Sequence, residues 1–329
     1  MFSLADSTPT WAMEHWPLLV QASISNQYSQ MKAVAAMVQT WDWHRVNVIF
    51  EDGTDLAFGR VILNLLEPLQ EVGADISHLV PLPSLIASSF STELLSLKGD
   101  QCRVFVVHTS LNLATYLFHK AQEMKKKEKD YVWIVTNTIT GFLHSFDVTT
   151  IRSMQGVLGV MNNFPESSLR FSEFKKRFQK KFSVDYPEER NNEPGISAVE
   201  AYDDALWAVA LTHALSRRNM PFTEKSKLYS DKISFVDFNG LTGRVQFVKR
   251  KLAPSHVFGI VNVIGKSYRE LGIWSEGSGF SKSTDDNDVY DSSMQHLGHV
   301  YWPGEPLHTP KGWALPNTYL WILANWCTY

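Results

Sequence analysis

Three short polar stretches each follow an apolar run of the kind that forms a buried strand. They are Glu51–Gly53, His108–Ser110 and Asn137–Thr140. Their carboxylate, imidazole, hydroxyl and amide groups can hydrogen-bond a small zwitterion. Ligands of open α/β sheets bind outside the carboxyl ends of the strands, so the sequence predicts a ligand pocket there. Turns also require polar residues, and three ordinary strand ends are the alternative interpretation.

The short motifs that mark common enzymes and metal sites do not occur in the sequence. It contains no glycine-rich nucleotide loop, zinc-type histidine or cysteine pair, or serine-hydrolase elbow. Cys102 opens an apolar run and is expected to be a small core residue. The carboxylates of Asp203 and Asp204 are adjacent on a predicted helix, so we expect them to point apart. The sequence predicts no enzyme activity, no cofactor and no metal.

Composition excludes several classes of partner and site. The net charge is −3 with 44% apolar residues among 329, which gives no electrostatic basis for binding nucleic acid and is enough to build a core. No apolar run approaches the roughly 20 residues that span a bilayer, and the first twenty residues lack the basic region of a signal peptide. We therefore expect this chain to stay in the cytosol when it is expressed alone.

Up to residue 164, strands alternate with helices in the sequence. This order with short connections predicts right-handed crossovers and a mostly parallel sheet. The expected strands are 45–52, 75–82, 102–110, 131–137 and 156–164. The expected helices are 25–41, 58–73, 91–99, 112–130 and 147–154.

Beyond residue 165 the pattern changes. Residues 171–182 place four phenylalanines on one helical stripe and lysines on the other, which favours a solvated basic face over a site for an acidic partner. The helix expected over 197–218 carries two apolar stripes: Val199, Tyr202, Leu206 and Val209 form one, and Trp207, Leu211 and Leu215 form the other. We expect the second stripe to lack cover. Residues 238–275 then predict antiparallel hairpins.

Several segments together resemble a known family. The most specific are GKSYRELGIWSEGSGFSK at 265–282 and the WPGE and PKGWALP motifs of the exit segment. Over about residues 24–318 the chain resembles the extracellular amino-terminal domain of plant glutamate receptor-like channels, in truncated form. The resemblance implies an α/β, type I periplasmic-binding-protein-like bilobal fold with mostly parallel sheets and an incomplete first lobe. The late hairpins would be the return through the hinge.

The resemblance also implies a division of the chain. It assigns 1–23 to an atypical N-terminal leader, 24–162 to lobe two, 163–250 to a partial lobe one, 251–280 to the hinge return and closing strands, and 281–329 to the exit segment and a divergent tail.

The implied function is that of a ligand-sensing domain of a glutamate receptor-like, ligand-gated cation channel, here without the pore. The parent receptor would lie in the membrane with this domain outside the cell. Its partners would be a small molecule such as an amino acid and other receptor subunits that bind through lobe surfaces. The alternative is a stand-alone soluble module that binds a small molecule or another subunit.

The candidate ligand-binding residues come from the strand ends and from the resemblance. They are Asp52, Phe58, His108, Thr109, Asn137 and Thr138. Phe58 and Asn137 occupy positions where amino-acid-binding relatives carry an aromatic and an acidic residue. Phe58 lacks a phenolic hydroxyl and Asn137 lacks the charge that would meet an ammonium group. We therefore expect glutamate and glycine to bind no more tightly than the millimolar range.

Overall fold

The computed structural model describes fifteen segments of the chain, within two compact units. The described residues are 2–3, 10–16, 19–21, 27–52, 56–83, 101–124, 130–163, 168–189, 192–216, 237–242, 244–248, 251–252, 257–282, 290–302 and 308–314. Unit 1 comprises Met1–Asn26 and Asn162–His256, and unit 2 comprises Gln27–Met161 and Val257–Tyr329.

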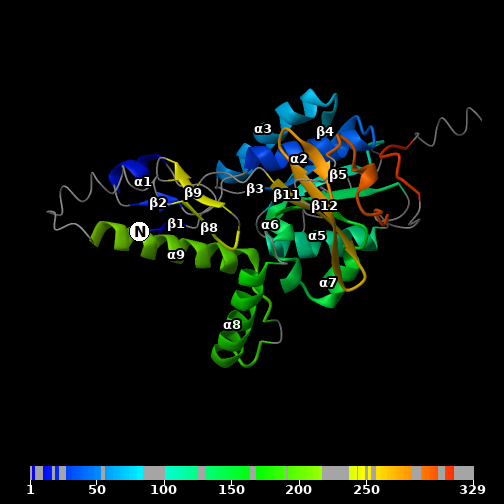
Figure 1. The fold of residues 1–329 in the computed structure, drawn as a ribbon. Coiled ribbons are helices and arrows are strands. Elements are labelled where there is room, and N and C mark those ends of the chain that lie inside the picture. Colours follow the sequence, from blue (N-terminus) through cyan, green and yellow to red (C-terminus); the bar gives the residue numbers. More distant parts are fainter. Residues whose placement is uncertain are drawn as a thin grey trace, which may run out of the picture. The chain divides into compact units, whose positions relative to one another are not determined.

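An eight-stranded mixed sheet forms the centre of unit 2 (Figure 1). Its order is β13-β12-β11-β7-β6-β5-β3-β4, and the pairs β4–β3, β3–β5, β5–β6 and β6–β7 are parallel. The strands are β3 (Arg45–Asp52), β4 (Asp75–Pro83), β5 (Val104–His108), β6 (Val132–Val135), β7 (Leu158–Asn162), β11 (Val257–Ile264), β12 (Ser267–Ser275) and β13 (Gly279–Ser281). The predicted α/β fold with a mostly parallel sheet is confirmed.

Side chains that alternate along the central strands fill two cores, one on each face of this sheet. Val104 and Val106 of β5 pack into the core shared with α2 (Gln27–Thr40) and α3 (Leu56–Glu71). Phe105 and Val107 pack into the core shared with α5 (Leu111–Glu123) and α7 (Val148–Ser153). Burial on both faces explains why these strands are continuous apolar runs in the sequence.

The other helices among the described residues of unit 2 are short. They are α6 (Asn137–Thr140) and the 3₁₀ turns η2 (Leu143–Ser145) and η4 (Met294–His296). No helix among the described residues combines the length and the apolar character that a bilayer crossing requires.

The late strands of unit 2 add an antiparallel edge to the parallel sheet. β11 pairs antiparallel with β12, and β12 pairs antiparallel with β13. The buried Asn262 of β11 uses its side-chain amide to bind the backbone of Tyr301, donating at 3.2 Å and accepting at 2.8 Å. The sequence prediction of antiparallel hairpins in this region agrees with these pairings.

Residues 310–314 bind along the start of β5. Arg103 N donates to Gly312 O at 2.9 Å, and Ala314 N donates to Gln101 O at 2.9 Å. Gly312 has φ +74°, and a Cβ there would lie 2.6 Å from the Trp43 ring. This segment therefore requires glycine to reach the indole.

The described part of unit 1 contains a smaller sheet and two long helices. The strand order is β1-β2-β10-β9-β8, with β9 antiparallel to both β8 and β10. Its elements are β1 (Phe2–Ser3), α1 (Thr10–His15), β2 (Val20–Gln21), α8 (Leu169–Asp185), α9 (Ile196–Ser216), β8 (Asp237–Asn239), β9 (Arg244–Val248) and β10 (Lys251–Leu252). Strands β1 and β2 lie in the stretch 1–23 that the sequence sets apart as a leader.

The burial pattern of α9 differs from the expected stripes. Trp207, expected to lack cover, is fully buried, whereas Leu206 and Val209 are 43% and 67% exposed. The buried face of α9 instead contains Val199, Asp203 and Trp207, which are spaced four residues apart. An inward carboxylate sets the orientation of this helix, and apolar periodicity could not indicate that.

Some expectations fall outside the described residues. These are the helix expected over 91–99, the tail beyond 314, and the side chains of Phe58, Leu211 and Leu215. The expected helix 112–130 ends earlier, at Glu123.

Candidate functional site

The predicted polar stretches follow three strands that are direct neighbours in the sheet. β5 lies between β3 and β6, and all three are parallel. Phe50 pairs with His108 and Val107 with Val135, so the strands end at one edge. The sheet thereby brings the candidate residues that follow these strands to the same edge. Figure 1 shows α6, which follows β6, at the end of this sheet.

A chain of hydrogen bonds links β5 to α6 at this edge. His108 Nδ1 lies 2.8 Å from Thr136 Oγ1, which lies 2.9 Å from Thr138 Oγ1. His108 and Thr136 are buried, and Thr138 is half-buried. The two buried groups therefore fix the orientation of a hydroxyl that reaches the surface.

The imidazole of His108 is neutral at physiological pH. Burial lowers the pKa of His108 from 6.5 to about 4, because the charged form loses its hydration. A neutral imidazole has one donor and one acceptor nitrogen, so the nitrogen that faces Thr136 determines whether that hydroxyl donates or accepts.

The candidate residues differ in their access to solvent. Asp52 is exposed, and Asn137 and Thr138 are half-buried. Thr109 is fully buried, and no described residue hydrogen-bonds its Oγ1. Phe58 lies in the first turn of α3, and its side chain is outside the description. A ligand at this edge would meet Asp52, Asn137 and Thr138 first.

The carboxylate of Glu51 occupies the beginning of α5. Its Oε2 accepts a hydrogen bond from Ser110 N at 2.8 Å. An anion at a helix N-terminus binds an otherwise unpaired N–H and the positive end of the helix dipole. This contact ties the end of β3 to the start of the helix after β5.

Two cavities are lined by described residues, and neither of them is the predicted strand-end pocket. Cavities of about 740 and 400 Å³ lie at the amino ends of β3 and β5 and along α8. Neither is lined by the six candidate residues. Within the described ranges, no cluster of three or more histidine, cysteine or acidic side chains could hold a metal ion.

Asp203 and Asp204 were not among the predicted site residues, but both are buried. Asp203 accepts three hydrogen bonds, from Leu241 N at 2.7 Å, Thr242 N at 2.8 Å and Thr242 Oγ1 at 2.7 Å. Asp204 Oδ2 has no hydrogen-bond partner among the described residues. Burial, with the nearby charges of Glu200 and Asp203, raises the pKa of Asp204 to about 7. Asp203 holds a loop, and Asp204 is a buried acid that titrates near neutrality.

The sequence matches the family described as the receptor family ligand binding region over residues 2–266. The chain belongs to this family. The match includes residues 2–23, which the sequence analysis assigned to a leader. The members of this family are receptor ligand-binding domains and not enzymes.

Curated relatives agree with this assignment. The chain is 32% identical to glutamate receptor 2.2, 33% to glutamate receptor 2.1 and 33% to glutamate receptor 2.7, all of Arabidopsis thaliana. The alignments cover 96%, 90% and 92% of this chain and 35%, 35% and 33% of those receptors. The chain therefore spans about a third of the length of these relatives. The resemblance to plant glutamate receptors is confirmed.

Proposed function

We propose that this chain is the ligand-sensing domain of a glutamate receptor-like, ligand-gated cation channel. It would comprise one nearly complete lobe and part of another in a bilobal, periplasmic-binding-protein-like fold. The family match and the relatives' names support this proposal. The domain would act outside the cell, with other receptor subunits as its partners. Closure of the lobes around a ligand is the expected mechanism of signalling.

The observation that carries the ligand site is that three neighbouring parallel strands end at one edge, where a chain of hydrogen bonds links the ends of β5 and β6. Thr138 Oγ1, held through Thr136 by His108, and the side chains of Asp52 and Asn137 form a polar edge. This edge combines carboxylate, amide and hydroxyl groups with a neutral imidazole. It suits a small, hydrogen-bonding ligand more than one that needs a buried anion as its counter-charge.

The test is a thermal-shift screen of the full chain against amino acids and small polyols, followed by calorimetry. We expect glutamate and glycine to bind in the millimolar range or more weakly. We expect Thr138→Val to weaken the best compound by about tenfold, since it removes an oriented hydrogen bond. Thr115→Val is the matched control, because Thr115 is also half-buried and bonds only its own helix, at Leu111 O.

Two results would contradict the proposed site. Micromolar binding of glutamate would mean that a charged counter-group outside this edge holds the ammonium. A best compound whose affinity is the same in Thr138→Val and in wild type would place the ligand elsewhere.

A further inference from the structure

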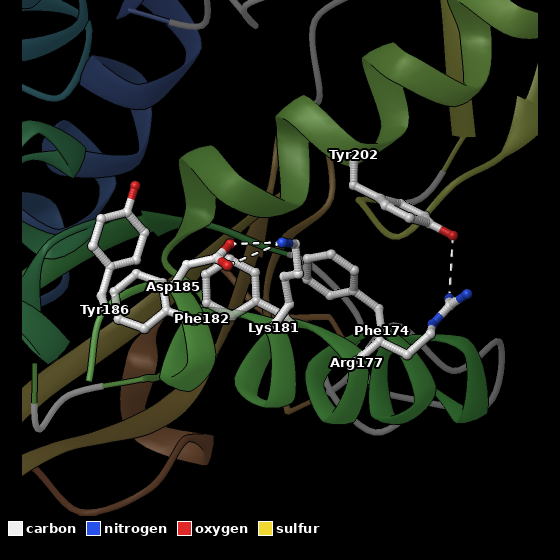
Figure 2. A pocket seen from close by; sticks show the side chains of 8 residues that line it. Phe174, Arg177, Lys181, Phe182, Asp185, Tyr186 and Tyr202 are labelled. Atoms are coloured by element: carbon white, nitrogen blue, oxygen red, sulfur yellow. Dashed lines mark hydrogen bonds and ion pairs between the residues drawn. The ribbon is translucent and has the colours of Figure 1, made fainter.

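A second pocket lies in unit 1, on α8 and beside α9 (Figure 2). Its volume is about 400 Å³, within the range of sites that hold small organic molecules. Five of its eight lining residues are aromatic. It shares no residue with the strand-end site, so it is a separate candidate.

The aromatic lining continues a ladder that begins in the core. Phe174 packs on Phe178, Phe178 on Phe182 and Phe182 on Tyr186, with ring centroids 5.9, 5.5 and 5.0 Å apart. Phe174 is buried, Phe178 and Phe182 are half-buried, and Tyr186 is 57% exposed. The core of unit 1 therefore ends part-way along α8, while the stacked rings continue beyond it.

Two cations border the pocket, and they differ in their partners. Lys181 pairs with Asp185 at 2.9 Å. Arg177 donates to the hydroxyl of Tyr202 at 3.3 Å and to Glu173 O at 3.4 Å. None of the described carboxylates forms an ion pair with Arg177. In Figure 2 the Tyr202 ring lies above the phenylalanine ladder and its hydroxyl points toward Arg177.

We propose that this pocket binds a small organic anion with a planar apolar body. The body would lie on the rings of Phe178 and Phe182, which line the pocket and are nearly parallel, with 19° between their planes. The acidic group would meet Arg177, whose planar fork suits a carboxylate, sulfonate or phosphate. Tyr202 would hold the guanidinium in place.

The charge of α8 argues against a second copy of the chain as the occupant. The helix carries six basic and two acidic residues, so two such helices face to face would repel each other. A neutral aromatic ligand would fill the apolar surface but leave the charge of Arg177 without a counter-ion. An anionic aromatic ligand satisfies both features.

The experiment uses two fluorescent probes that differ in charge. 1-Anilinonaphthalene-8-sulfonate has a planar naphthalene ring and a sulfonate, and N-phenyl-1-naphthylamine has the same rings without the charge. Each is titrated into the full chain. We expect one saturable site per chain for the sulfonate, and weaker binding of the neutral probe.

Variants separate this pocket from general apolar binding. Arg177→Gln should lower the affinity for the sulfonate probe about tenfold, because the charge pair is lost. The affinity for the neutral probe should change by no more than about twofold. Lys176→Gln is the matched control: Lys176 is exposed on the same helix but does not line the pocket, so both probes should bind as in wild type. Phe182→Leu should weaken both probes.

Three outcomes would overturn the proposal. They are no saturable sulfonate binding, equal effects of Arg177→Gln and Lys176→Gln, and no effect of Phe182→Leu on either probe. Circular dichroism of each variant shows whether α8 is retained. If Phe182→Leu unfolds, the comparison of Arg177→Gln with Lys176→Gln decides, since both of those side chains are exposed.

Discussion

His108 Nδ1 lies 2.8 Å from Thr136 Oγ1, so the end of β5 is bound to the end of β6 by two buried side chains. Because the imidazole is buried, a second proton would create a charge that water cannot hydrate, and this lowers the pKa of His108. The hydrogen bond also makes the orientation of the Thr138 hydroxyl depend on the protonation state of a histidine.

The first prediction concerns the pH dependence that follows from this pair. Burial lowers the pKa of His108 from 6.5 to about 4, so the unfolded chain takes up the proton first as the pH falls. Stability from this group is complete above pH 6.5 and is lost as the pH falls through about 4. The loss is on the order of 3 kcal/mol.

Urea unfolding at pH 7, 5 and 4 measures this effect. His108→Asn keeps an amide near the Thr136 hydroxyl and does not titrate, so its free energy of unfolding should fall less between pH 7 and pH 4. An equal fall in both proteins would show that His108 is not the titrating group.

The second prediction compares two buried threonines of unit 2. Thr109 Oγ1 has no partner among the described residues, whereas Thr140 Oγ1 donates to Val160 O at 2.8 Å. Thr109→Val keeps the shape and removes an unsatisfied hydroxyl, so it should leave stability unchanged or raise it by about 1 kcal/mol. Thr140→Val should lower stability by about 1–3 kcal/mol. Denaturant midpoints measure both, and a marked loss in Thr109→Val would reveal a hydrogen bond at that hydroxyl.

The third prediction concerns Asp204, whose contribution to stability depends on pH in the opposite direction from that of His108. Burial, followed by the charges of Glu200 and Asp203, raises the pKa of Asp204 from 3.8 to about 7, so the folded protein holds the proton more tightly. The stabilisation is complete below pH 3.8 and is lost as the pH rises through about 7. Asp204→Asn should therefore gain stability over wild type at pH 8, by about 2–4 kcal/mol, and little at pH 4. Thermal melts at the two pH values test this, and a gain that is equal at both would contradict it.

The fourth prediction concerns the loop that Asp203 holds. A Cβ at Gly240 would lie 2.4 Å from Asp203 Oδ2, so Gly240→Ala must displace a carboxylate that accepts three hydrogen bonds. We expect a loss of about 2–4 kcal/mol. Gly259→Ala is the control, because its nearest contact would be at 3.4 Å, with the Glu270 side chain. Differential scanning calorimetry measures both, and similar melting temperatures for the two variants would refute the prediction.

The central sheet could be predicted from the sequence because its strands are buried on both faces. Runs such as Val104–His108 and Val132–Val135 are apolar throughout, and polar residues mark where they end. The carboxyl ends of parallel strands lie at one edge of a sheet, so the convergence of the three strand ends could be predicted, although β3 and not β4 lies beside β5. The hydrogen bond between His108 and Thr136 could not be predicted from the sequence, since the direction of each side chain depends on how it packs.

Unit 1 was harder to predict because its helices are oriented by contacts that are distant in sequence. Asp203 faces inward to bind residues 241–242, nearly forty positions later. Apolar periodicity assigns such a carboxylate to the surface and gives α9 the wrong buried face. The phenylalanines of α8 could be recognised in the sequence as a helical stripe. How far each ring is exposed could not, because it depends on where the core of unit 1 ends.

The binding of residues 310–314 beside Gln101 and Arg103 has a mechanical consequence. This segment is attached at the amino end of β5, and the polar site lies at the carboxyl end of the same strand, about 20 Å away. Hydrogen-bonded strands do not slide past one another, so the sheet moves as a rigid lever. A ligand that tilted the carboxyl edge would therefore also move residues 310–314, because backbone hydrogen bonds at Gln101 and Arg103 hold them to the same strand.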